Sequence, residues 1–118
     1  MERNLDLVRV ILIETDKNQQ PEAPIEIAAP GYSPSQIAYH VQLLAQAGLI
    51  RALDFSAGPD ADWRPTSLTW QGHEFLAAAR NESIWHQVKA RLKDRGLDAP
   101  LSIVQQLAIQ IAASMLGL

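Results

Sequence analysis

The sequence predicts a mainly helical protein with one small β-hairpin. Two observations carry this prediction. Apolar residues recur at three- and four-residue spacing in five segments, and the second of these segments is followed by two alternating segments around a Gly-Pro loop. The chain has 118 residues, of which 47% are hydrophobic and 19% are charged. This length and composition suit a single globular domain and exclude a disordered chain.

Each predicted helix starts at a residue that can cap it or open it. These residues are Asn4, Ser33, Thr69, Asn81 and Pro100. The helices are expected over residues 4–18, 34–47, 70–79, 82–95 and from 100 almost to the C-terminus. Ser33 gives the strongest signal, because Pro34 takes the first helical position and Gln36 completes a capping box. Gly48 and Gly96 are expected to end the second and fourth helices.

The segments between the helices predict the β structure. Residues 49–55 alternate between apolar and polar side chains and are expected to pair with a returning strand at 67–69. The polar stretch 56–65 between them is expected to be the hairpin loop. Residues 24–28 also alternate, which predicts either a short strand or an extended arm.

Acidic and basic side chains are distributed unevenly along the chain. The total is 10 Lys and Arg against 13 Asp and Glu, but Glu14 to Asp62 holds seven acidic side chains and two basic ones. The excess of cations lies in the fourth predicted helix and just before it, at Arg80, Lys89, Arg91, Lys93 and Arg95. Two interpretations of this basic face stay open: a nucleic-acid contact, or a solvated face whose cations lie near the C-terminal end of a helix.

No constellation in the sequence is typical of an enzyme or a metal site. The absence of cysteine excludes disulfides and thiolate zinc sites. His73 and Glu74 begin like the zinc-protease motif H-E-x-x-H, but Ala77 stands where the second histidine is required. There is no glycine-rich phosphate loop either. We therefore expect no enzymatic activity, no cofactor and no metal.

The aromatic residues and His40 have competing interpretations. Trp70 and Trp85 are expected in the core, whereas Trp63 either joins the core or offers a stacking surface for unpaired bases. His40 either contacts a partner or folds over the hairpin and bonds to a backbone carbonyl.

Residues 40–50 read H-V-Q-L-L-A-Q-A-G-L-I and residues 68–72 read L-T-W-Q-G. In this order, with a hairpin between them, the two segments resemble the winged-helix domain of bacterial regulators. More closely, the chain resembles a family of small uncharacterised bacterial and prophage proteins. The motifs of that family are D-L-V-R-x-I-L, G-Y-S-x-x-x-I-A-Y-H and L-T-W-x-G-H-E-F-L, and they stand here at 6–12, 31–40 and 68–76. The family brings no established activity.

The resemblance implies a winged-helix-like core over residues 1–69 and a helical extension over 70–118, packed together as one compact domain. The chain departs from the pattern at one place. Only about nine residues, 23–31, stand where a helix-turn-helix has its complete second helix, so that helix must be short, distorted or missing.

The winged-helix resemblance implies a non-enzymatic regulator that binds double-stranded DNA. The expected contacts are Ser35, Gln36, Tyr39 and His40 on the second helix and Arg64 on the wing. The acidic excess of this region opposes DNA binding. The alternative is therefore a protein-binding module that kept the winged-helix frame, such as a prophage accessory protein directed at a host protein.

Residues 99–118 carry no charged side chain. An apolar stripe opposes four polar residues at every fourth position, and it predicts a homodimer through this helix. The stripe consists of Val104, Leu107, Ile111, Met115 and Leu118. The glutamines and serines make the segment too polar to cross a membrane. Since no signal peptide is visible and cysteine is absent, we expect a cytoplasmic protein.

Overall fold

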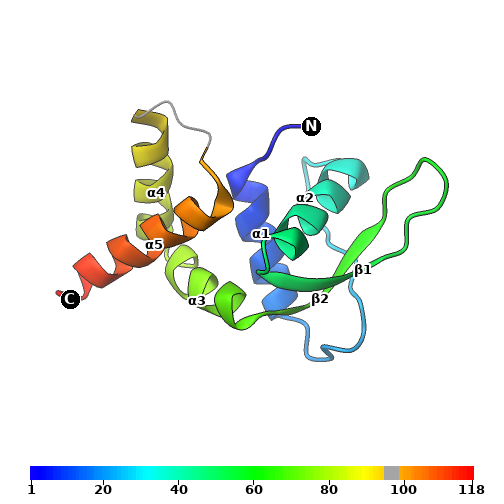
Figure 1. Ribbon diagram of the computed structural model, residues 1–118, viewed down its shortest axis with the longest axis horizontal. Coiled ribbons are helices and arrows are strands. Elements are labelled where there is room, and N and C mark those ends of the chain that lie inside the picture. Colours follow the sequence, from blue (N-terminus) through cyan, green and yellow to red (C-terminus); the bar gives the residue numbers. More distant parts are fainter. Residues whose placement is uncertain (95–98) are drawn as a thin grey trace. The chain divides into compact units, whose positions relative to one another are not determined.

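The computed structural model describes residues 1–94 and 99–118, which form five α-helices and a two-stranded antiparallel sheet (Figure 1). The helices are α1 (Leu5–Asp16), α2 (Pro34–Gln46), α3 (Trp70–Ala79), α4 (Glu82–Asp94) and α5 (Leu101–Met115), and the strands are β1 (Ile50–Asp54) and β2 (Trp63–Leu68). The predicted fold class, mainly helical with a small hairpin, is confirmed. The expected helix stop at Gly96 lies outside the described residues. The chain divides into two units, Met1–His73 and Glu74–Leu118.

Side chains cap the starts of the first four helices as predicted. Asn4 Oδ1 accepts from the amide of Leu7 at 3.0 Å, and Asn81 Oδ1 accepts from Ile84 at the same distance. These bonds satisfy backbone donors that the first turn of a helix leaves free. Capping is local chemistry, which explains why these helix starts could be predicted from the sequence.

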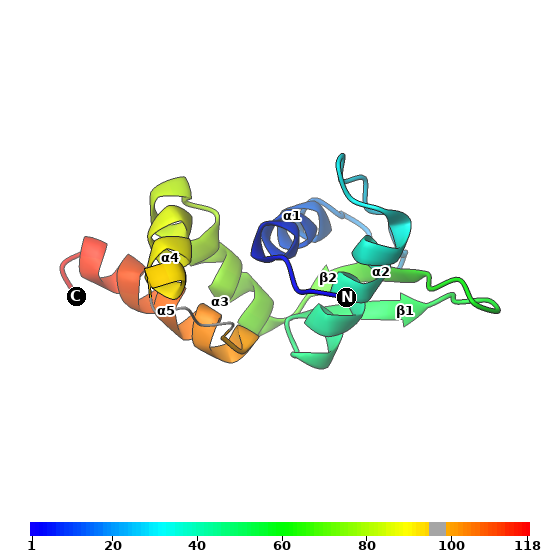
Figure 2. The same cartoon turned by 90° about the horizontal axis from the view of Figure 1, so that it is seen from above.

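The first unit packs α1 and α2 against each other and against the hairpin (Figures 1 and 2). Its core contains side chains that are fully buried: Leu7, Val8, Ile11, Leu12, Val41, Leu44 and Leu49. Burial of a side chain of this size contributes about 1.5–3 kcal/mol relative to exposure. The apolar stripes of the two helices therefore hold the hairpin in place.

The hairpin is longer on its return side than the sequence predicts. β2 begins at Trp63 instead of at residue 67, and Trp63 pairs with Asp54 of β1. The sequence predicts a loop over 56–65 partly because Pro65 has no amide hydrogen to donate to a β ladder. The structure accommodates Pro65 in β2 opposite Ala52, next to an irregularity in the register between Arg51 and Ala52.

Residues 17–33 form neither a helix nor a strand. The segment 24–28 is therefore the extended arm of the two predicted alternatives, and the second helix of a helix-turn-helix is missing. The arm is held along β2 by backbone and side-chain hydrogen bonds. The amide of Ile25 donates to the carbonyl of Pro65 at 3.0 Å, and Asn18 Nδ2 donates to the carbonyl of Thr66 at 2.7 Å.

The end of α2 and the start of α3 meet at a tight junction. Gly48 adopts a positive φ of 78°, which ends α2 and turns the chain toward β1. Thr69 Oγ1 donates to the carbonyl of Gly48 at 2.6 Å and accepts from the amide of Gly72 at 3.1 Å. Gly72 lies so close to the carbonyl of Leu49 that a Cβ there would overlap the oxygen. The G-L-I and L-T-x-x-G segments therefore form the close contact that joins the end of α2 to the start of α3.

The second unit contains α4 and α5, which pack against each other. Trp85 is buried, as predicted, and its ring lies 6.2 Å from that of Phe75 between centroids. The prediction that Trp70 lies in the core is wrong, because its side chain is 75% exposed at the start of α3 in the first unit. The close approach of Gly72 to Leu49 and Leu68 explains this, because residues two positions apart lie on nearly opposite sides of a helix, so Trp70 faces away from that contact.

Candidate functional site

The N-terminal half of α2 is fixed by a complete capping box. Ser33 Oγ accepts from the amide of Gln36 at 3.1 Å, while Gln36 Oε1 accepts from the amide of Ser33 at 2.8 Å. The side-chain amide oxygen of Gln36 is therefore already bonded within the helix start. Of the contact residues predicted on α2, Ser35 is exposed and Tyr39 is half-buried. This surface offers hydroxyl groups and no cation.

His40 does not reach the surface, so the predicted contact with DNA or a partner is wrong, whereas the alternative, a bond from the ring to a backbone carbonyl, is present. Its side chain is fully buried, and Nε2 lies 2.7 Å from the amide of Asn4. The amide is a donor, so Nε2 must accept, and Nδ1 then donates to the carbonyl of Gln36 at 2.7 Å. Burial lowers the pKa of His40, with a further contribution from Arg3. His40 is a neutral bridge that joins α2 to the cap of α1.

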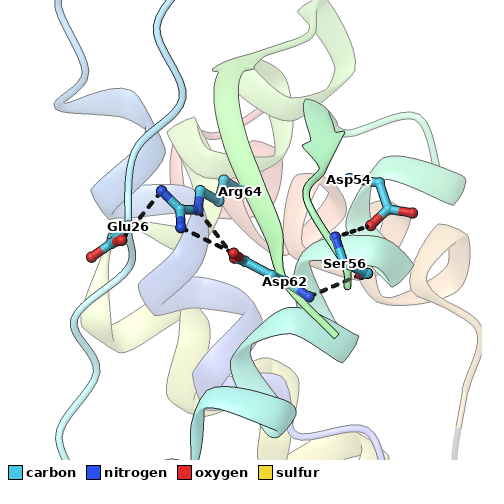
Figure 3. A network of polar contacts seen from close by, with 5 residues as sticks. All are labelled: Glu26, Asp54, Ser56, Asp62 and Arg64. Atoms are coloured by element: carbon cyan, nitrogen blue, oxygen red, sulfur yellow. Dashed lines mark hydrogen bonds and ion pairs between the residues drawn. The ribbon is translucent and has the colours of Figure 1, made fainter. Parts of the chain in front are cut away.

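The base of the hairpin loop carries a network of polar side chains (Figure 3). Arg64 donates from Nε and Nη2 to the two carboxylate oxygens of Asp62, at 3.1 and 3.0 Å. Its Nη1 lies 3.2 Å from Oε1 of Glu26 on the arm. On the other strand, Asp54 accepts from the amide of Ser56, whose Oγ accepts from the amide of Asp62. The network ties the arm and both sides of the hairpin together.

The ionisation of these groups follows from the network. The hydrogen bonds from Arg64 lower the pKa of Asp62, and the same bonds raise the pKa of Arg64. Hydrogen bonds from Ser56 lower the pKa of Asp54. All three groups are therefore charged at neutral pH. Arg64, predicted as a wing contact to DNA, forms ion pairs with the carboxylates of Asp62 and Glu26. Its guanidinium also lies 5.1 Å from the centroid of the Phe55 ring.

A pocket of about 430 Å³ opens beside this network. It is lined by the arm and the adjoining start of α2, and by a segment distant in the sequence, the end of the hairpin loop with the start of β2. The apolar part of the lining is Ile27, Pro34, Ile37, Ala38, Ala61 and Trp63, and the charged part is Glu26, Asp60, Asp62 and Arg64. The lining therefore combines an apolar wall with three carboxylates and one guanidinium.

The basic residues predicted on the fourth helix lie in the second unit. Arg91 and Lys93 are exposed on α4, Lys89 is half-buried there, and Arg80 lies in the turn that precedes α4. Arg95 lies outside the described residues. Since Arg91 and Lys93 stand in the last turn of α4, their charges also stabilise the helix dipole. Both interpretations of this face therefore remain predictions.

The structure divides the predicted dimer stripe on α5. Val104 and Ile111 are buried within the chain, so they cannot form an interface with a second copy. Leu107 is half-buried, whereas Met115 and Leu118 are exposed. The apolar arc of α5 is wider than one contact, and the sequence alone could not tell which part α4 covers.

Within residues 1–94 and 99–118, no three His, Asp or Glu side chains are grouped so that they could hold a metal ion. Among the same residues, no helix combines the length and the apolar character needed to span a membrane. The three histidines have different surroundings: His40 is buried, His73 lies 3.8 Å from Asp16, and His86 is exposed on α4. The buried side-chain nitrogen and oxygen atoms of the described part all have hydrogen-bond partners.

Comparison with known proteins assigns the chain to a family. Residues 2–98 match the family described as "Hypothetical protein (DUF2513)". The chain belongs to this family. An uncharacterised protein of Haemophilus influenzae (strain ATCC 51907 / DSM 11121 / KW20 / Rd) is 35% identical over 118 residues, covering 99% of this chain and 100% of the relative. No solved structure matches the chain.

The family match contains the pocket and the hairpin network, since both lie within residues 2–98. Sequence reasoning did not identify the pocket residues Glu26, Asp60 and Trp63 as one site. The acidic count over residues 14–62 was the one available signal, because it marked an excess of carboxylates on the predicted wing. It could not show that the arm of this DUF2513 protein folds back beside them.

Proposed function

We propose that the protein is a non-enzymatic cytoplasmic interaction module that binds another protein through the arm, the start of α2 and the hairpin. The observation that carries this proposal is the state of Arg64. Arg64 is the cation in the lining of the pocket, and it is ion-paired with Asp62 at 3.0 Å and with Glu26 at 3.2 Å. A face organised in this way combines apolar wall, polar rim and fixed charges, which suits a protein partner.

The same observation argues against duplex DNA at this face. DNA binding draws most of its affinity from Lys and Arg on phosphates. α2 contains neither Lys nor Arg, and a phosphate approaching Arg64 would meet Asp60, Asp62 and Glu26 in the same pocket. Repulsion from these carboxylates opposes binding unless a second subunit supplies cations.

A DNA-binding regulator is the competing candidate. The order of α2, hairpin and α3 supports it, since it resembles a winged helix, and the exposed cations Arg91 and Lys93 of α4 offer a second electrostatic contact. The salt dependence of binding separates the two candidates, because each phosphate contact contributes to the slope of log K against log salt.

We expect no saturable binding of a labelled random-sequence duplex at roughly 10 μM protein, in about 50 mM salt or in about 200 mM salt. Fluorescence anisotropy measures this directly. Affinity that is present at low salt and falls steeply at the higher concentration would support the regulator instead. In that case Arg91→Gln with Lys93→Gln tests whether α4 supplies the contact, and Ser35→Ala tests α2.

Protein binding is tested by a photo-crosslinking residue placed at Phe55, which is exposed on the hairpin face. The same residue at Ala77, exposed on α3, is the matched control. In cells that produce the protein naturally, we expect one discrete protein adduct from position 55 and none from position 77. Purification through a tag on the identified partner must recover this chain. Equal adducts at both positions, or none at either, would contradict the proposal.

We further propose that the protein forms a homodimer through the C-terminal end of α5. Met115, Leu116 and Leu118 are all more than half exposed, and they form an apolar surface with no charged neighbour in residues 99–118. Light scattering after gel filtration should give the mass of a dimer at micromolar concentration. Leu116→Glu should give a monomer, whereas Ser102→Glu, at the other end of α5, should remain dimeric. A monomeric wild-type protein contradicts the proposal.

A further inference from the structure

The pocket between the arm, α2 and the hairpin has the size of a recognition site. Its volume of about 430 Å³ falls within the range of about 300–1,000 Å³ that ligand pockets occupy. One wall comes from Ile27 of the arm, another from Pro34 and Ile37 of α2, and a third from Trp63 of β2. None of these four side chains is fully buried, so an apolar stem that enters the pocket would cover apolar surface that water now reaches.

The charges of the pocket select the sign of its occupant. Glu26, Asp60 and Asp62 carry three negative charges against the single positive charge of Arg64. Arg64 is satisfied by Asp62 and Glu26, as the distances of 3.0 and 3.2 Å show. Asp60 is exposed, and its carboxylate makes no hydrogen bond or ion pair with the described residues. The pocket thus holds an excess of negative charge with one carboxylate still available.

The apolar wall and the carboxylate of Asp60, which is unpaired among the described residues, together define the chemistry of the occupant. An anion would be repelled, and a small hydrated cation would leave the apolar wall exposed. An arginine side chain satisfies both features, because its methylene stem is apolar and its planar guanidinium pairs with carboxylates and stacks on aromatic rings. Trp63 supplies such a ring in the lining, and Asp60 supplies the carboxylate.

We propose that this pocket receives an arginine side chain, with an adjoining apolar residue, from the protein partner. The inference rests on the proposed protein-binding function and names the chemistry that the partner presents. The guanidinium pairs with Asp60 at the mouth, while its stem and the adjoining apolar side chain lie between Trp63 and Ile37. The interaction is non-covalent, and it weakens as salt screens the exposed carboxylates.

The probe is a blocked Leu-Arg-Leu tripeptide, titrated into the isotope-labelled full chain and followed by amide and indole NMR shifts. We expect saturable shifts at Trp63, Ala61 and Ile37. The matched ligand control is the same peptide with citrulline, which keeps the shape of arginine and removes its charge. Citrulline should weaken binding by about tenfold or more, because a charge-assisted pair is lost. Equal affinity for both peptides would overturn the proposal.

Asp60→Asn tests the carboxylate on the protein side. Its side chain makes no bond within the described residues, so the substitution should leave the fold intact. The NMR spectrum of the variant without peptide checks this. We expect the Leu-Arg-Leu affinity to fall by about threefold to fivefold, as for an exposed ion pair. Glu22→Gln, which removes an exposed carboxylate outside the pocket, should leave it unchanged. Equal effects of the two substitutions would show a general charge effect and overturn the assignment.

The outcomes separate this inference from the function on which it rests. A specific adduct from position 55 with no binding of the arginine peptide would sustain the protein-binding function and refute arginine as the residue recognised. Absence of both the adduct and peptide binding would refute both. Peptide binding that shifts α4 or α5 resonances instead of Trp63 would place the cation elsewhere and overturn the assignment of this pocket.

Discussion

Gly72→Ala is expected to destabilise the protein by about 2–3 kcal/mol, although the substitution improves helix propensity. Gly72 lies in α3, where a change from glycine to alanine normally stabilises by about 1 kcal/mol. Here the added Cβ would overlap the carbonyl oxygen of Leu49, which is backbone and also accepts from the amide of Thr69 at 3.1 Å. The helix can relieve the overlap only by moving away from the hairpin.

The free energy of unfolding from urea denaturation, followed by circular dichroism, measures this effect. Gln71→Ala is the matched control, since Gln71 is the exposed neighbour of Gly72 in the same turn. It should change the stability by less than about 0.5 kcal/mol, as surface substitutions usually do. A stabilised Gly72→Ala variant would show that propensity decides and that the close approach is not a constraint.

His40→Phe should lower the free energy of unfolding by about 1–3 kcal/mol at neutral pH. Phenylalanine fills a similar volume, but it cannot accept from the amide of Asn4 or donate to the carbonyl of Gln36. The loss thus falls on the bridge between α2 and the start of α1. Urea denaturation measures it, and His86→Gln serves as the control because His86 is exposed on α4.

The wild-type protein should also lose stability as the pH falls below about 6.5. Burial lowers the pKa of His40 in the folded state below 6.5, so the unfolded chain binds the proton more readily in this window. A protonated Nε2 would then point a donor at the amide of Asn4. One proton gives a slope of at most about 1.4 kcal/mol per pH unit. His40→Phe should flatten this slope between pH 5 and 7 (about the range of histidine titration), while His86→Gln keeps it. An unchanged slope in His40→Phe would show that His40 is not its source.

Features that depend on neighbouring residues could be predicted from the sequence. The capping box of Ser33 and Gln36, the caps at Asn4 and Asn81 and the helix stop at Gly48 all act within a few residues, and the structure confirms them. Trp70 shows where such reasoning fails. Its size indicated the core, but the exposed side of α3 is fixed by a contact with Leu49, which lies twenty-one residues earlier.

The candidate site could be predicted only in part for the same reason. Arg64 was identified as a wing residue, and one of its ion-pair partners, Asp62, stands only two positions before it in the sequence. Its second partner, Glu26, comes from an arm that carries no helix or strand signal, so nothing in the sequence placed the two together. The sequence left two interpretations of His40, a contact or a bond to a backbone carbonyl, and only its burial against the start of α1 decides for the second.

The irregular arm has one more consequence, which concerns conformational entropy. Residues 17–33 contain Pro21, Pro24 and Pro30, and each proline ring restricts its own φ and the residue before it. The unfolded arm therefore samples fewer conformations, and less freedom remains to be lost when the wall of the pocket forms. A partner that docks on this wall meets a surface that is already ordered, and its binding energy is not consumed in arranging the chain.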